Sequence, residues 1–426
     1  MLARVPDPAT RVVFAATLVV GTGYGVSIAL TALRLNDLGF SKAAIGTLAS
    51  VFATGIVLAS LPMGAILRRV SAKSVLVASL AGYAVCVGAF PFLESAGAIS
   101  AARFLDGACS VATWIGFETV LLRRAESHQK AYVMSIYAIA IALGYMLGPL
   151  LAKGIVAFAP MRMAFLASSA LAVGASILVV IRLDGAAAER PIAGATDVDA
   201  GTGAALSTLA ILRRIRTSLF GTFAYGYFQA SVVLFLPLFL IERRGVAEPR
   251  TILMPAFFAA GMLLFSNAAG KLGDRVGHLL VMRALATVGA AMIAGFVWLQ
   301  SWPLMCVAIF VAGATLAAIS PVSLALQGVV VDASSYGRAN SLYNAAYAAG
   351  MLVGPLLSSV FFDRLGGGAM LAHLAALWAA FVLFTIACWR DDPAARRRTP
   401  TQDSRSLWPA ARAEGAGQGE GEVGVD

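Results

Sequence analysis

Long apolar runs dominate the chain and set its secondary structure. A helix of about 20 residues crosses the hydrocarbon core of a bilayer, and the sequence contains twelve runs of about this length. Strands of a membrane barrel would alternate apolar and polar residues, and these runs do not alternate. The pattern therefore predicts an all-α membrane protein with twelve transmembrane helices. The predicted ranges are 12–33, 44–66, 74–93, 99–121, 131–158, 163–181, 217–241, 252–269, 280–299, 303–325, 340–362 and 370–389.

Two stretches of the first half return 206 residues later. The basic segment that begins at Gly64 has a fuller copy at Gly270, where Arg69 and Val70 correspond to Arg275 and Val276. Two matches at one spacing indicate a duplication, so the twelve helices are expected to form two pseudo-symmetric six-helix bundles. The second match pairs Tyr137, Gly144, Gly148 and Pro149 with Tyr343, Gly350, Gly354 and Pro355.

The polar segments divide the chain into parts. We expect a 35-residue connection, rich in Ala, Gly and Asp, to be a flexible linker whose basic end lies on the membrane surface. The Gly- and Glu-rich C-terminal tail is expected to be disordered. The predicted parts are an N-terminal tail (1–11), a first bundle (12–181), the linker (182–216), a second bundle (217–389) and the C-terminal tail (390–426).

The net charge of +10 has an uneven distribution. If the N-terminus is inside, the inner segments, counted together with Arg283 near the inner end of the span 280–299, hold 23 Lys and Arg, and the outer loops hold seven. This is the positive-inside bias, so both termini are predicted to be cytoplasmic in a multi-pass protein of the inner (plasma) membrane. The positive charge is therefore explained by the orientation in the membrane and by contact with membrane lipid. Nucleic acid is not expected as a partner.

Several classes of site are not indicated by the sequence. The four cysteines lie within apolar runs, and the three histidines are too scattered to bind a metal. The glycines at 21, 23 and 25 lie inside a membrane run, and Gly270-Lys271 lacks the rest of a phosphate-binding loop. We therefore expect no metal, no cofactor and no enzymatic activity.

The segment Gly270–Leu279 carries a family resemblance. We expect it to be a tight loop between two helices, with the form Gly-x-Leu-x-Asp-Arg-x-Gly. It resembles the signature between the second and third helices of each half in the major facilitator superfamily, on the residues Gly270, Asp274, Arg275 and Gly277. The first-half copy is degraded, with Arg68 in place of the Asp and Ser71 in place of the second Gly. The resemblance covers residues 12–389 and implies a carrier whose bundles rock about a site near the midplane.

The resemblance also assigns a role to Asp274. A carboxylate is favoured at the positive end of a helix dipole, and the family's loop Asp meets a helix of the opposite half. We therefore expect Asp274 to contact the start of the fifth helix, around 131–134, and to hold the inner gate shut. Arg68 has the wrong sign for the equivalent contact, so the gate is expected to be asymmetric.

Ionisable residues interrupt the fourth predicted helix. Arg103 and Asp106 are three residues apart and share a face, and Glu118 lies about 18 Å further along. The segment resembles the superfamily motif Leu-x-x-x-Arg-x-x-Gln-Gly, which is linked to proton transfer, and a poorly characterised bacterial branch with Glu-Ser or Glu-Thr here. Glu118, Asp106 and Arg103 are therefore proton-coupling candidates, with Glu118 the best placed to hold a proton. The alternatives are a neutralised Arg103–Asp106 pair and a Glu118 that pairs with Arg123 or Arg124.

The segment Gly144-x-x-x-Gly148-Pro149 resembles the start of the antiporter motif of the same superfamily. Ala152 and Lys153 replace its last two glycines. Glycines one turn apart allow another helix to approach closely, and a following proline kinks the helix. We interpret Gly144, Gly148 and Pro149, with Gly350, Gly354 and Pro355, as packing and gate residues.

Other polar residues in the apolar runs are candidates for the wall of a substrate cavity. By analogy with the family, helices 1, 4, 7 and 10 surround the transport path. The alternative for each residue is an interhelical contact, or packing in the case of Trp114. The candidates are Tyr24, Ser27, Trp114, Tyr225, Gln229, Ser320 and Ser323.

Together these features predict a monomeric secondary transporter. We expect proton-coupled efflux of a small organic molecule by alternating access. Facilitated transport or uptake of a sugar or metabolite is the alternative within transport. A non-transporting membrane sensor or scaffold is the alternative from another class.

Overall fold

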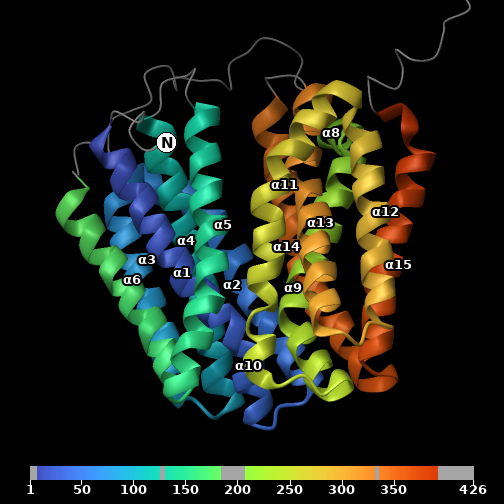
Figure 1. Ribbon diagram of the computed structural model, residues 1–426. Helices are drawn as coiled ribbons and strands as arrows, with labels where there is room; N and C mark the ends of the chain where they lie inside the picture. The colour runs from blue at the N-terminus through green and yellow to red at the C-terminus, as the bar shows by residue number, and fades with distance from the viewer. Residues whose placement is uncertain (1–6, 125–129, 184–206, 332–334, 392–426) are drawn as a thin grey trace, which may run out of the picture.

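Twelve long helices make up the part of the protein that the structure describes (Figure 1). The computed structural model describes residues 7–124, 130–183, 207–331 and 335–391, and no strand occurs within these ranges. The twelve predicted spans and the all-α membrane class are confirmed. The spans are α1 (Pro8–Asp37), α2 (Lys42–Arg69), α3 (Ala72–Ala89), α4 (Ala96–Arg124), α5 (Lys130–Phe158), α6 (Arg162–Arg182), α9 (Arg216–Arg244), α11 (Met254–Val276), α12 (His278–Phe296), α13 (Trp302–Val330), α14 (Tyr336–Leu365) and α15 (Gly367–Ala387).

Short helical segments accompany the spans. They are α8 (Thr208–Arg214) before α9, α10 (Glu248–Thr251) before α11, and two 3-10 turns, Phe90–Phe92 and Trp389–Asp391. Ile211 and Ile215 are buried and pack with Val331 and Ala339 at the ends of α13 and α14. The rest of the predicted linker, 184–206, lies outside the described residues, as does the C-terminal tail from residue 392 onward.

The helices form two groups with the same internal contacts (Figure 1). In the first group α1 packs on α5, α2 on α4, and α3 on both α4 and α6. In the second group α9 packs on α14, α11 on α13, and α12 on both α13 and α15. Each pair in one group therefore has its counterpart in the other. The pseudo-symmetry predicted from the 206-residue spacing is present in the packing.

Glycine pairs bring the backbones of two helix pairs into contact. A Cβ atom added to Gly148 of α5 would lie 2.5 Å from the carbonyl carbon of Gly25 in α1. Gly144 faces Gly21 in the same way, at 2.7 Å from its carbonyl carbon. In the second group a Cβ on Gly350 would lie 2.8 Å from the backbone nitrogen of Tyr227 in α9. The repeated glycine motif thus lies where two helices approach too closely for any side chain.

The segment Gly270–Leu279 was predicted to be a loop, but most of it is helical. The predicted length of the loop was therefore wrong. Helix α11 continues through Val276, and α12 begins at His278. The reversal needs only Gly277, whose φ of 103° favours glycine. In the first half α2 likewise runs to Arg69, and the Ser71 side chain accepts a hydrogen bond from the Ser74 N–H to start α3.

The two groups meet at one end and diverge at the other. We call the upper end the one where α1 begins, as drawn in Figure 1. At the lower end, Ser50 of α2 donates a hydrogen bond of 2.7 Å to the Leu352 carbonyl of α14, and Ile45 is buried. Toward the upper end the ribbons of α5 and α11 lie apart (Figure 1). The two groups therefore contact each other below and lie apart above.

Candidate functional site

Arg103 and Asp106 form an ion pair inside the first helix group. The Nη1 atom of Arg103 lies 2.6 Å from Oδ2 of Asp106, and both side chains are largely buried. The guanidinium lies over the ring of Phe52, 4.3 Å from its centroid, and Ser110 donates a 3.2 Å hydrogen bond to the other oxygen of Asp106. The pairing predicted from the three-residue spacing is present, and it balances both charges.

A hydrogen-bonded network continues from this pair across four helices. The Tyr24 hydroxyl of α1 bonds to Ser110, and its ring stacks on Tyr83 of α3 at 4.3 Å. The Tyr83 hydroxyl lies 3.2 Å from both Ser27 and Ser168, on α1 and α6. Tyr24 and Ser27 are 4% and 8% exposed. In this conformation their side chains form hydrogen bonds inside the first helix group and do not line an open cavity.

Glu118 differs from Asp106 in having no partner. Its side chain is half-buried on α4, three turns above Asp106, and it has no hydrogen-bond or ion-pair partner among the described residues. The predicted alternative partner Arg124 bonds to both carboxylate oxygens of Asp7, at 2.5 Å each. Glu118 is therefore a carboxylate in an apolar helix that no cation of the described chain balances.

Asp7 keeps Arg124 engaged over a wide pH range. Its carboxylate caps α1 by accepting a 3.0 Å hydrogen bond from the Thr10 N–H. Burial alone would raise the pKa of Asp7, but the hydrogen bonds from Arg124 and Thr10 outweigh it and lower the pKa to about 2. Asp7 is thus ionised at any physiological pH, and the charge of Arg124 is matched.

Trp114 lies one helical turn before Glu118 and is half-buried. Its ring is tilted against Tyr24, with centroids 5.2 Å apart. The Tyr137 hydroxyl of α5 donates a 3.4 Å hydrogen bond to the Trp114 carbonyl. Trp114 and Glu118 therefore share one face of α4, next to α1 and α5.

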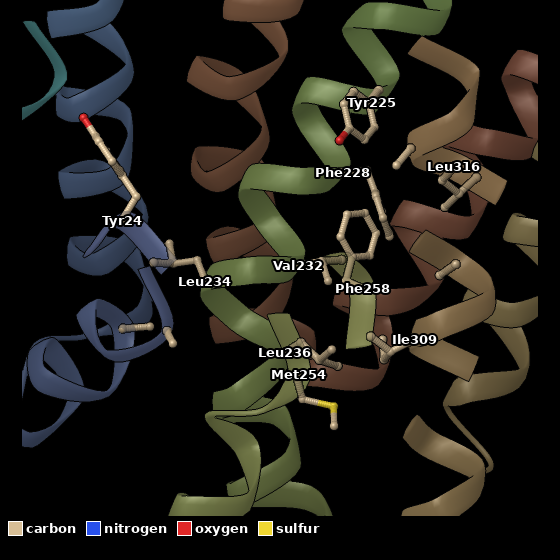
Figure 2. Close-up of a cluster of buried hydrophobic side chains, with 14 of the residues drawn as sticks. Tyr24, Tyr225, Phe228, Val232, Leu234, Leu236, Met254, Phe258, Ile309 and Leu316 are labelled. Carbon is tan, nitrogen blue, oxygen red and sulfur yellow. The ribbon is translucent and has the colours of Figure 1, made fainter. Parts of the chain in front are cut away.

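The second helix group presents a second aromatic cluster. The Tyr347 hydroxyl of α14 donates a 2.7 Å hydrogen bond to Oε1 of Gln229 on α9, and the rings of Tyr225 and Tyr347 are 5.9 Å apart. Figure 2 shows Tyr24 on α1 and Tyr225 on α9, with apolar side chains of α9 and its neighbours below Tyr225. Gln229 also borders a small apolar pocket with Val232 and Phe258.

Ser320 and Ser323 take part in an interhelical contact. Both hydroxyls lie close to the Tyr343 hydroxyl of α14, at 3.0 and 2.9 Å. Tyr343 is the residue that repeats Tyr137 in the second half. The two serines therefore join α13 to α14 in this conformation.

Asp274 lies exposed at the upper end of α11. Its side chain is 70% exposed, and its hydrogen-bond partner among the described residues is His278 of α12, at 3.1 Å. Among the described side chains, which do not include those of residues 130–132, no hydrogen bond or ion pair joins Asp274 to the start of α5 in this conformation. The physical reason is that the upper ends of the two groups lie apart.

Charged residues at the lower end were not predicted from the sequence. Lys42 at the start of α2 lies 2.5 Å from Glu242 of α9, and the Ala43 N–H donates a 2.8 Å hydrogen bond to Asp363 of α14. A carboxylate at the N-terminus of a helix is stabilised by the helix dipole. The charge pair and the cap both join the two groups. Few Lys and Arg occur in the segments of this end. Their small number is the sequence feature that could have drawn attention to Lys42.

Known proteins resemble the chain over most of its length. The sequence matches the Major Facilitator Superfamily over residues 12–300 and again over residues 219–416. An uncharacterized MFS-type transporter, YcaD, from Salmonella enteritidis PT4 is 23% identical over 343 residues, which cover 80% of this chain and 86% of that protein. YcaD from Escherichia coli O17:K52:H18 is 22% identical over 349 residues, with the same coverage.

Solved structures share the fold at low sequence identity. The nucleoside transporter NupG has a TM-score of 0.72 at 14% identity and covers 90% of this chain and 100% of its own. A bacterial homolog of the human lysosomal transporter Spinster, inward-facing and occupied, has a TM-score of 0.69 at 13% identity and covers 92% and 96%. Family match, relatives and fold agree with the twelve spans and the paired helix groups: the chain belongs to the Major Facilitator Superfamily and is a multi-pass membrane transporter.

Proposed function

We propose that the protein exports a small organic molecule in exchange for protons. The strongest support is the environment of Glu118. This acidic side chain lies within a membrane helix and has no partner among the described residues. Ionisable residues inside a membrane are costly and mark ion or substrate pathways. Asp106 is less suited to the role, because Arg103 and Ser110 already bind both of its oxygens.

Alternating access gives Glu118 a way to load and release a proton. In the present conformation the groups diverge at the upper end (Figure 1), and Glu118 lies in the last two turns of α4, which ends at Arg124 on that side. If the groups close there and separate below, the surroundings of Glu118 change from wet to dry. A carboxylate binds a proton more readily when water is removed, so rocking of the groups couples protonation to transport. Transport of the exported compound in proteoliposomes under an imposed pH gradient tests this proposal.

We assign the upper end to the cytoplasm. The segments predicted to be cytoplasmic hold 23 Lys and Arg against seven in the outer loops, and the described ones among the 23, such as Arg69, Arg124 and Arg275, lie at this end. On this assignment the described conformation is open to the cytoplasm, where an exporter takes up its substrate. The bacterial Spinster homolog with a similar fold is itself described as inward-facing.

Cysteine labelling tests the orientation. In a variant without the four native cysteines, Ala247→Cys, which is exposed at the lower end, is expected to react with a membrane-impermeant maleimide in intact cells. Ala193→Cys in the linker, outside the described residues, is expected to react only after the membrane is permeabilised. Reaction of both positions in intact cells would contradict the assignment.

The lower-end contacts are expected to set the balance between the two conformations. Replacing Asp363 by alanine removes the carboxylate from the start of α2, and such a contact contributes about 1 kcal/mol. The lower end is then expected to open roughly fivefold more often. The measurement is the labelling rate of Ser50→Cys, which is buried between α2 and α14.

The neighbouring Arg364 supplies the control for this test. Its side chain is exposed, so Arg364→Ala is expected to leave the labelling rate of Ser50→Cys unchanged. An equal rate in the Asp363→Ala variant and the parent would show that Asp363 does not hold the lower end closed.

A further inference from the structure

Trp114 and Glu118 form a partly exposed pair of complementary groups. They are four residues apart on α4, so they share a face about 6 Å apart along the axis. Both side chains are half-buried, and so both remain partly accessible. Trp114 offers an aromatic ring and Glu118 a negative charge.

Among the described residues, no cation forms an ion pair or hydrogen bond with Glu118. On α4 itself, Arg124 is bound to Asp7, and Arg123 lies more than one turn away, at the end of the helix. From α1 the pair meets Tyr24, and from α5 it meets Tyr137, which bonds to the Trp114 backbone. These groups are aromatic and neutral, so they do not compensate the carboxylate.

The aromatic cluster of the second helix group is also neutral. In it Tyr347 bonds to Gln229, and Tyr225 bonds to Met262. The charged residues of α11, Lys271, Asp274 and Arg275, lie in its last two turns at the upper end and are exposed. Of the described side chains in the two clusters named here, the partly exposed ones are thus two aromatic rings, Trp114 and Tyr347, the amide of Gln229 and one carboxylate, Glu118.

This combination favours one class of ligand. The face of an aromatic ring attracts a cation, and a buried carboxylate is stabilised when a cation or a proton neutralises it. An anionic ligand would meet an uncompensated negative charge. A flat aromatic cation can contact the rings and place its charge beside Glu118 at the same time.

We infer that Trp114 and Glu118 bind an organic cation with a flat aromatic part, so that the transported compounds belong to this class. The inference rests on the proposed function, and it gives that function a simple basis. The Glu118 carboxylate accepts either the proton or the cation. Binding of the cation then displaces the proton, and binding of a proton on the other side releases the cation.

Binding to the purified protein in detergent tests the inference without transport. The probes are 10-methylacridinium, a flat aromatic cation, and acridine, which has the same ring system and is uncharged at pH 8. We expect the wild-type protein to bind the cation at least tenfold more tightly than acridine. We expect Glu118→Gln to abolish this preference and Glu118→Asp to keep it.

Two further readouts separate charge from shape. Trp114→Leu is expected to weaken binding of the cation roughly fivefold, whereas Glu94→Gln, an exposed acid before α4, should change nothing. In weakly buffered solution near pH 7, binding of 10-methylacridinium should release protons from the wild-type protein and none from Glu118→Gln.

Equal affinity for the two probes, or a preference that survives in Glu118→Gln, would overturn the inference. That outcome differs from a failure of the proposed function. A protein that couples transport to protons through Glu118 but binds both probes equally would carry neutral compounds. A protein that prefers the cation but transports it without proton movement would refute proton coupling and leave the binding site in place.

Discussion

Replacing Glu118 by glutamine is expected to abolish transport against a gradient. Glutamine keeps the size and hydrogen-bonding capacity of the side chain but cannot carry a proton or a charge. The proton gradient then has no carrier and cannot drive accumulation. Exchange of substrate across the membrane should continue in part, because exchange requires no net proton transfer.

Proteoliposomes that contain the purified variant provide the measurement. The substrate is the compound that cells with the protein export and cells without it retain. Glu94→Gln serves as the control, because this exposed acid lies at the other end of α4. If Glu118→Gln still accumulates substrate with the normal number of protons, Glu118 is not the carrier, and Asp106 is the next residue to test.

Replacing Gly148 by valine is expected to have the largest effect on folding. The added Cβ atom would lie 2.5 Å from the carbonyl carbon of Gly25, which belongs to a backbone that cannot rotate away. Helices α1 and α5 would have to separate along their whole contact. Overpacking of this kind lowers the free energy of unfolding by about 3 kcal/mol. The pair of α1 and α5 also holds most of the first group together.

The same helix offers a matched control for this variant. Nothing lies within 4 Å of the position that a Cβ would take at Gly154. Gly154→Val is therefore expected to keep the melting temperature in detergent and the yield, while Gly148→Val lowers both. Equal melting temperatures for the two variants would contradict the backbone contact. Gly350→Val should repeat the loss in the second group.

The apolar runs were sufficient to locate every membrane-spanning helix of the described residues but not its ends. The first run suggested 12–33, whereas α1 extends from Pro8 to Asp37. Hydropathy marks the part of a helix that meets lipid, and hydrogen bonding carries the helix further into the polar regions. The cap at Asp7 and the turn at Gly277 depend on single residues, and an average over about twenty residues does not detect them.

The candidate site was predictable where it depended on spacing along one helix. Arg103 and Asp106 are three residues apart, and their ion pair follows from helix geometry. The lower-end pair of Lys42 and Glu242 joins residues 200 positions apart. Such a pair depends on how the helix groups are placed, which no local pattern encodes.

Conformation explains the remaining difference between sequence and structure. Asp274 was expected to close the upper end, and in the described conformation that end is open. The charge contact between a helix start and an acid of the opposite group exists at the lower end instead, through Asp363. A sequence can indicate which residues form a gate without indicating which gate is shut.

Proton movement that accompanies substrate movement tests the central claim most directly. Proteoliposomes are loaded with substrate and with the pH-sensitive dye pyranine and are then diluted into substrate-free buffer. As substrate leaves, the account predicts that protons enter and acidify the interior, and that Glu118→Gln shows no acidification. Loss of substrate at the full rate without any change in internal pH would contradict proton-coupled export and indicate facilitated transport.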